Sequence, residues 1–290
     1  MEAITETKVR ALSEELKMLK KKDQLEEVEE KSQRLLELAQ TNHIPEFEAE
    51  ALYYQAYCYF TKGMDKDCLQ YCFQAEEICE NYHILYTSVL LHNLQGIVYA
   101  NCGDFLSALH HYLKGYYLTI DHPEFRYHYV IINNLGTLFK EIGDEEKAGE
   151  YFIRAFQERR KMKEEYSLND GIILSNIIIS MTKLQKKGKT YWKQVYEKHY
   201  KDYEYQILKE NEIIADIYEN VATQDKDALK QNITAFMKCT KQSHDFMNSF
   251  HNYLSILQIC IDLNMKELSY LLFDDLQQYM VCLLYTSRCV

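Results

Sequence analysis

The sizes of the side chains follow a pattern that repeats every 40 residues, and this pattern constrains the fold of the chain more than any other feature of its sequence. Small residues stand at Ala56, Gly96 and Gly136. Five further series keep the same step: Gly63, Gly103 and Gly143; Tyr59, Tyr99 and Phe139; Cys68, Ala108 and Ala148; Cys72, Tyr112 and Phe152; Ala75, Gly115 and Ala155. A fixed period of this length is typical of stacked helical units, none of which can bury its apolar face alone.

Glycines mark two kinds of position within each unit. Gly136 lies inside a stretch, 134–156, that otherwise has a helical pattern. Since a mid-helix Gly costs about 1 kcal/mol relative to Ala, we expect another backbone to come close there. The Gly-Asp pairs at 103–104 and 143–144 predict turns, in which Gly is left-handed and Asp caps the helix that follows.

The order of small residues, aromatic residues and Gly within each unit resembles the tetratricopeptide repeat. This resemblance implies an all-α fold: a right-handed α-solenoid of antiparallel helix pairs, forming a tetratricopeptide-like superhelix. We expect about 14 helices and no strand pairing, because a period of two never persists beside turn signals. Pro45 and Pro123 are expected in loops between repeats.

The strength of the pattern varies along the chain and predicts four segments. Residues 1–45 are expected to form a divergent N-terminal helix pair, and 46–186 the repeats of about 40 residues. Residues 187–281 are expected to form degenerate C-terminal helical repeats. The segment 282–290, CLLYTSRCV, resembles a translated adaptor tail, and we expect it to be a non-native or truncated end.

The charge balance argues against nucleic-acid binding. Lys and Arg number 33 against 44 Asp and Glu, a net charge of −11, and basic runs occur only at 20–22, 158–163 and 185–189. We interpret these runs as solvated helix ends, where cations favour the helix dipole, with an anion or RNA site as the alternative. No apolar run is long enough to span a membrane and no secretory signal is present, so we expect a cytoplasmic protein with reduced cysteines.

Several groups of residues are candidate sites for chemistry. Cys68, Cys72 and Cys79 could present thiolates towards His83 for zinc, but two of them occupy packing positions of the repeat, which favours buried apolar thiols. The segment 186–190, KKGKT, ends like a phosphate-binding loop, but it lacks the first Gly and a preceding strand.

The histidine pairs offer no better candidate for catalysis. They are His110 with His111, and His122 with His128. We interpret them as surface or loop residues, since no partner stands at a recognisable spacing. We therefore predict a protein that is not an enzyme and has no catalytic, cofactor-binding or metal site.

In the tetratricopeptide family, the first helix of each pair lines a concave groove in which ligand contacts recur. Carried onto this sequence, the resemblance implies a peptide-binding face made by Tyr53, Tyr57, Asn93, Ile97, Asn133, Asn134, Thr137 and Asn176. An Asn amide both donates and accepts, so it can pair with the backbone of an extended peptide of any sequence. Alternatively, Asn93 and Asn133 cap local turns or bond between helices.

The predicted function is a non-catalytic module that binds a protein or peptide segment, as the sensory or scaffolding part of a bacterial signalling protein. The tyrosine-rich helical pattern resembles the N-terminal regulatory region of GGDEF-type diguanylate cyclases. An alternative function is therefore that of such a regulatory region without its catalytic domain. A second alternative is a peptide-pheromone-type transcription regulator lacking its DNA-binding domain, for which residues 1–45 are too short and too acidic. No nucleic acid or membrane is expected as a partner, and a homodimer stays open.

Overall fold

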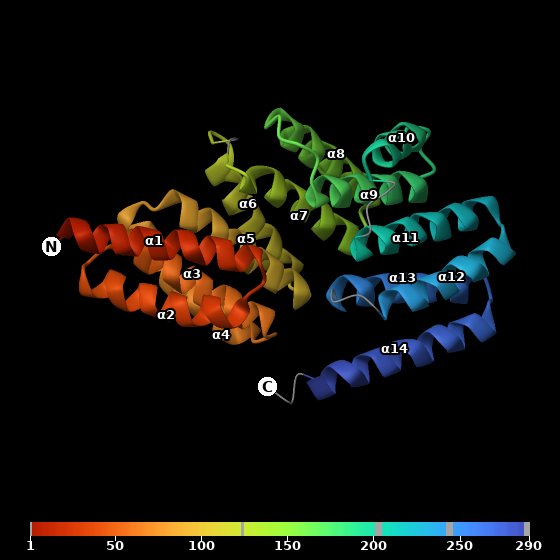
Figure 1. The fold of residues 1–290 in the computed structure, drawn as a ribbon. Coiled ribbons are helices and arrows are strands. Elements are labelled where there is room, and N and C mark those ends of the chain that lie inside the picture. The colour runs from red at the N-terminus through yellow and green to blue at the C-terminus, as the bar shows by residue number, and fades with distance from the viewer. Residues whose placement is uncertain (1, 123–124, 201–204, 242–245, 287–290) are drawn as a thin grey trace. The chain divides into compact units, whose positions relative to one another are not determined.

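The computed structural model describes residues 2–122, 125–200, 205–241 and 246–286, which form fourteen helices and contain no strand (Figure 1). The helices are α1 (Glu2–Lys21), α2 (Leu25–Thr41), α3 (Pro45–Thr61), α4 (Asp65–Tyr82), α5 (Leu85–Asn101), α6 (Phe105–Thr119), α7 (Tyr127–Glu141), α8 (Glu145–Lys161), α9 (Leu168–Lys183), α10 (Lys189–Tyr200), α11 (Gln206–Thr223), α12 (Lys226–Thr240), α13 (Phe246–Asp262) and α14 (Lys266–Thr286). The predicted all-α helical repeat fold is confirmed. Residues 287–290 of the predicted tail lie outside the described residues.

The helices divide into two compact units, residues 1–134 and 135–290. In the first unit α1 packs on α2, α3 on α4 and α5 on α6, and in the second α11 packs on α12 and α13 on α14. The first helices of neighbouring pairs also contact one another, α1 with α3, α3 with α5, and α9 with α11. Within each unit, side chains on successive first helices therefore share a face.

The turns inside the pairs have the predicted conformation. Gly63, Gly103 and Gly143 have φ of 69°, 76° and 85°, a left-handed conformation that costs Gly little. The backbone N–H of Ser107 donates to Asp104 Oδ1 at 3.1 Å, so Asp104 caps α6. Asp144 caps α8 in the same way, accepting from the backbone N–H of Lys147 at 3.1 Å. The Gly-Asp pairs thus end one helix and begin the next.

The mid-helix glycines lie where an aromatic ring of the next helix approaches closely. A Cβ atom at Gly96 would lie 2.5 Å from the ring of Tyr112, and one at Gly136 would lie 2.7 Å from the ring of Phe152. The carbonyl oxygen of Ala148 lies farther away, at 3.3 Å from the Cβ position of Gly136. A close approach was correctly predicted, but its main partner is a ring and not a backbone.

Pro45 does not lie in a loop, as predicted, because it is the first residue of α3. The first turn of a helix has no internal acceptor for its N–H groups, and the fixed φ of proline suits that position. Pro123 lies outside the described residues.

Candidate functional site

The predicted binding residues of the first unit lie on first helices that contact each other. Tyr53 and Tyr57 are one turn apart on α3, and Asn93 and Ile97 are one turn apart on α5. Tyr53 and Asn93 are buried, whereas Tyr57 and Ile97 are half-buried. A ligand on this face would meet the partly exposed side chains of Tyr57 and Ile97 directly.

Asn93 takes part in a hydrogen bond between helices. Its Oδ1 accepts from Nδ2 of Asn134 on α7 at 2.9 Å. The alternative prediction, that Asn93 bonds between helices, is therefore correct for its side-chain oxygen. Nδ2 of Asn93 donates to no residue in the described part of the chain, and it is the group that remains for a ligand. Asn133 and Asn134 are both half-buried.

The second unit contains the other two predicted residues, Thr137 on α7 and Asn176 on α9, both half-buried. Beside Asn176, Oγ of Ser175 accepts from Nδ2 of Asn211 on α11 at 2.8 Å. Each unit therefore has an amide hydrogen bond between successive first helices. Sequence reasoning missed Asn211, because the 40-residue step does not extend to α11.

Lys20, at the end of α1, contacts two tyrosines of α3. Its Nζ donates to Tyr53 Oη and lies 4.6 Å from the ring centroid of Tyr53 and 4.1 Å from that of Tyr57. Burial lowers the pKa of Lys20 to about 8, because it disfavours the charged ammonium. Our interpretation of the run 20–22 as a solvated helix end was wrong for Lys20, since the tyrosines that cover it come from α3.

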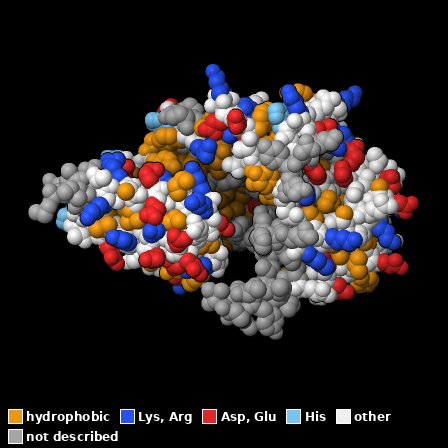
Figure 2. All heavy atoms as spheres, viewed as in Figure 1, with side chains coloured by type: hydrophobic (Ala, Val, Ile, Leu, Met, Phe, Trp, Pro, Cys, Tyr) orange, Lys and Arg blue, Asp and Glu red, His pale blue; other side chains and the backbone are white. Residues whose placement is uncertain are grey.

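The other basic runs are largely neutralised by acidic side chains. Lys161 pairs with Glu158 at 2.7 Å and Lys186 pairs with Glu146 at 3.0 Å. On the face shown in Figure 2, Lys and Arg side chains are interspersed with Asp and Glu. Lys189 of the KKGKT segment pairs with Glu219, and a helix, α9, precedes that segment where a phosphate-binding loop needs a strand.

Two histidines predicted at the surface are buried. His111 on α6 is 8% exposed, with its Nδ1 3.3 Å from Nδ1 of His92 on α5. His128 on α7 is 5% exposed, and its Nδ1 lies 2.9 Å from Oγ1 of Thr119. The prediction was wrong for both residues because each lies on the packed side of its helix, where it has a polar partner that is distant in sequence.

The His92–His111 contact belongs to a polar cluster between α4, α5 and α6. His92 Nδ1 is 3.2 Å from Gln95 Oε1, and Gln95 Nε2 donates to Glu76 Oε2 at 2.9 Å. Lys114 Nζ lies 3.5 Å from Glu76 Oε1. Burial and the neighbouring His92 lower the pKa of His111 to about 4, so both imidazoles are neutral near pH 7 and one N–H can face the other ring nitrogen.

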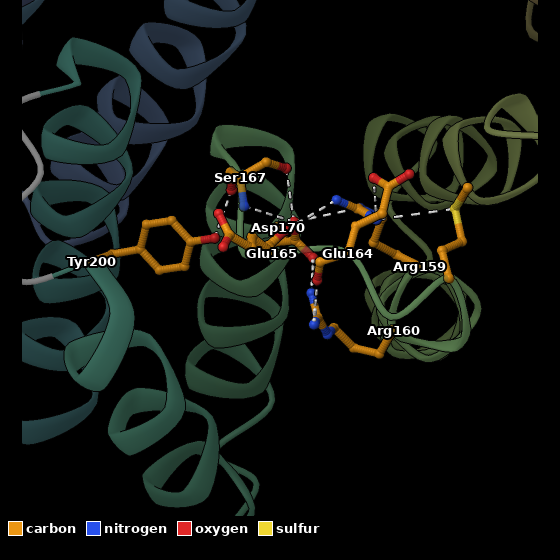
Figure 3. Close-up of polar contacts among 8 residues, drawn as sticks. Arg159, Arg160, Glu164, Glu165, Ser167, Asp170 and Tyr200 are labelled. Carbon is orange, nitrogen blue, oxygen red and sulfur yellow. Dashed lines mark hydrogen bonds and ion pairs between the residues drawn. The ribbon is translucent and has the colours of Figure 1, made fainter.

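A second polar cluster joins α8, α9 and α10 (Figure 3). Asp170, which is fully buried, lies 3.4 Å from Nε of Arg159 and 3.2 Å from Nη1 of Arg160. It also accepts from Oγ of Ser167 at 2.7 Å, and Tyr200 Oη donates to the Ser167 carbonyl at 2.5 Å. Because Asp170 is paired with two Arg side chains and Tyr200 bonds to the backbone of Ser167, this cluster holds the loop between α8 and α9 in place.

The three candidate zinc-binding cysteines are packed in the first unit. Cys68 and Cys72 are fully buried and Cys79 is 3% exposed. A hydrogen bond to Cys68, together with burial, raises the pKa of the Cys72 thiol, and burial raises that of Cys79 to about 12. No three His, Cys, Asp or Glu side chains are grouped to hold a metal ion within the part of the chain that the structure describes.

None of the described helices is both long enough and apolar enough to cross a membrane.

Comparison with known proteins identifies the fold. The sequence matches no described protein family and no curated protein. A Rap protein complexed with Competence and Sporulation Factor is similar over 93% of this chain and 74% of its own, with a TM-score of 0.74 at 14% identity. The Rap conjugation gene regulator of plasmid pLS20, in complex with the Phr* peptide, is similar over 92% and 73%, with a TM-score of 0.61 at 15% identity.

The name of a third similar structure includes the tetratricopeptide repeat. It is a signal transduction ATPase with numerous domains and a tetratricopeptide repeat sensor, from Pyrococcus horikoshii, and it is similar over 87% of this chain and 40% of its own. The TM-score is 0.57 at 14% identity. The chain has a tetratricopeptide-type helical repeat fold.

Proposed function

We propose that this chain is a non-catalytic module that binds an extended peptide or protein segment along the first helices of its repeats. The observation that carries the proposal is the contact between α3, which bears Tyr53 and Tyr57, and α5, which bears Asn93 and Ile97. Aromatic side chains supply apolar contact area, and an amide pairs with a peptide backbone without regard to its sequence.

The geometry of packed helices suits an extended ligand. Packed helices lie about 8–10 Å apart, and an extended chain advances about 3.3 Å per residue. Side chains on α3 and α5 would therefore meet a peptide at positions about three residues apart. Nδ2 of Asn93 would donate to a peptide carbonyl, while its Oδ1 keeps the bond to Asn134.

The similar solved structures support a binding role. One is a complex with the Phr* peptide, and that protein is named a conjugation gene regulator. A peptide-controlled regulator is therefore the second candidate function. A place in bacterial signalling, the diguanylate cyclase alternative, a homodimer, the cytoplasmic location and the four predicted segments stay predictions.

Affinity selection from a mixed-sequence octapeptide library, read by mass spectrometry, tests the proposal on the full chain. Retained peptides should then bind the Asn93→Asp variant about tenfold more weakly, because this exchange removes the Nδ2 donor and keeps the oxygen that accepts from Asn134. Asn81→Asp is the matched control, since Asn81 is an exposed residue of α4 and the charge change is the same. Retention of no peptide, or equal binding by both variants, would contradict the proposal.

A further inference from the structure

Lys20 is a largely covered cation for which the described residues provide no ion pair. Its contacts are the hydroxyl of Tyr53 and the rings of Tyr53 and Tyr57. Nearby lysines differ: Lys17 pairs with Glu14 at 2.8 Å, and Lys62 pairs with Glu29 at 2.7 Å. Lysine is almost never buried without a partner charge, because water solvates the ammonium better than tyrosine does.

The arrangement around Tyr53 supplies a second hydrogen-bond donor. The hydroxyl of Tyr53 accepts from Lys20, and the side chain of Tyr127 on α7 lies beside it and interacts with it. If Tyr53 donates its own proton to Tyr127, the hydroxyl hydrogen of Tyr127 is left for another acceptor. Lys20 and Tyr127 are therefore both neighbours of the Tyr53 hydroxyl.

A ligand can reach these groups, since Lys20, Tyr57 and Tyr127 all keep part of their surface exposed. Tyr53 and Tyr57 also belong to the face that we propose for peptide binding. The peptide that we propose as ligand would therefore lie beside Lys20, which lacks a counter-charge among the described residues, in the first unit.

We propose that Lys20 and Tyr127 bind a carboxylate of the peptide that lies along the first helices. The inference rests on the proposed function and adds an anionic position to it. A carboxylate carries a single charge, which matches the single ammonium, and it has two oxygens for two donors. The carboxylate is either the C-terminal group of the peptide or the side chain of Asp or Glu.

The test uses the full chain and three octapeptide libraries of mixed sequence. The first has free C-terminal acids and no Asp or Glu, the second has C-terminal amides and includes Asp and Glu, and the third has amides and no Asp or Glu. We expect strong retention from the first or the second library, which identifies the source of the carboxylate. Retention from the third library should be at least tenfold lower.

Retained peptides are then measured with three variants. Lys20→Met keeps the apolar stem and removes the charge, and it should weaken binding at least tenfold, whereas Lys20→Arg should bind within about threefold of the parent chain. The control is Lys62→Met, because Lys62 also lies over a tyrosine ring, 5.9 Å from that of Tyr59, but has Glu29 as a partner. It should bind as the parent chain does.

Thermal unfolding separates binding from folding. The Lys20→Met variant should have a melting temperature equal to or above that of the parent chain, because the substitution removes an unpaired charge from a largely covered position. Equal retention from all three libraries, or unchanged binding by Lys20→Met, would overturn the inference and leave peptide binding intact. Retention from no library would overturn both proposals.

Discussion

Gly136 on α7 lies against the ring of Phe152 on α8, so that a Cβ atom at residue 136 would come within 2.7 Å of two ring carbons. Gly136→Ala should lower the free energy of unfolding by about 1–3 kcal/mol, because the ring has to move and the pair of helices is overpacked. Gly149→Ala on α8 is the matched control, since a Cβ atom there would lie 3.6 Å from Ser180, an ordinary contact. It should be neutral or stabilising, as Ala favours a helix over Gly. Urea unfolding of both variants checks this, and equal changes would contradict the close approach.

Acid should destabilise the first unit through the pair of His92 and His111. The folded-state pKa of His111 is about 4, below its ordinary value near 6.5, so this histidine contributes stability above pH 6.5 that is lost as the pH falls towards 4. The loss should be about 1–2 kcal/mol, because the carboxylate of Glu76 partly stabilises the protonated ring of His111. The measurement is urea unfolding between pH 7.5 and pH 4, in which His111→Gln should flatten the pH dependence. His110→Gln, at an exposed neighbour on α6, should leave it unchanged, and an equal effect of the two would refute the assignment.

Among the carboxylates of the cluster between α8 and α9, Asp170 should contribute most to the stability of the fold. Asp170→Asn should cost about 3 kcal/mol of unfolding free energy, because Arg159, only 2% exposed, would lose a buried counter-charge. The same exchange at Asp144 serves as the control and should cost less than about 1 kcal/mol, since Asn also caps a helix well. Chemical unfolding of the two variants gives the comparison, and a loss at Asp170 no larger than that at Asp144 would show that the pairing does not stabilise the fold.

The thiols of Cys68, Cys72 and Cys79 should behave as packing residues. Purified protein should contain no stoichiometric zinc, and a chelator should leave its helical circular dichroism unchanged. A thiol reagent should label the exposed Cys102 in the folded chain and reach Cys68 and Cys72 only after unfolding. One bound metal per chain, lost together with the helical signal on chelation, would restore the zinc alternative.

The sequence by itself determined the local features of this protein. The helical repeat, the number of helices, the Gly turns, the Asp caps and the close approach at Gly136 all depend on residues within one helix pair, where spacing along the chain sets the geometry. Tertiary structure decided which distant side chains meet: Lys20 with Tyr53, His92 with His111, and Asn93 with Asn134. These partners lie 33, 19 and 41 residues apart and on different helices. A helical period shows that a residue lies on a packed face, but the partner of a buried polar group depends on the rotation and offset of the neighbouring helix, which packing of the whole unit sets.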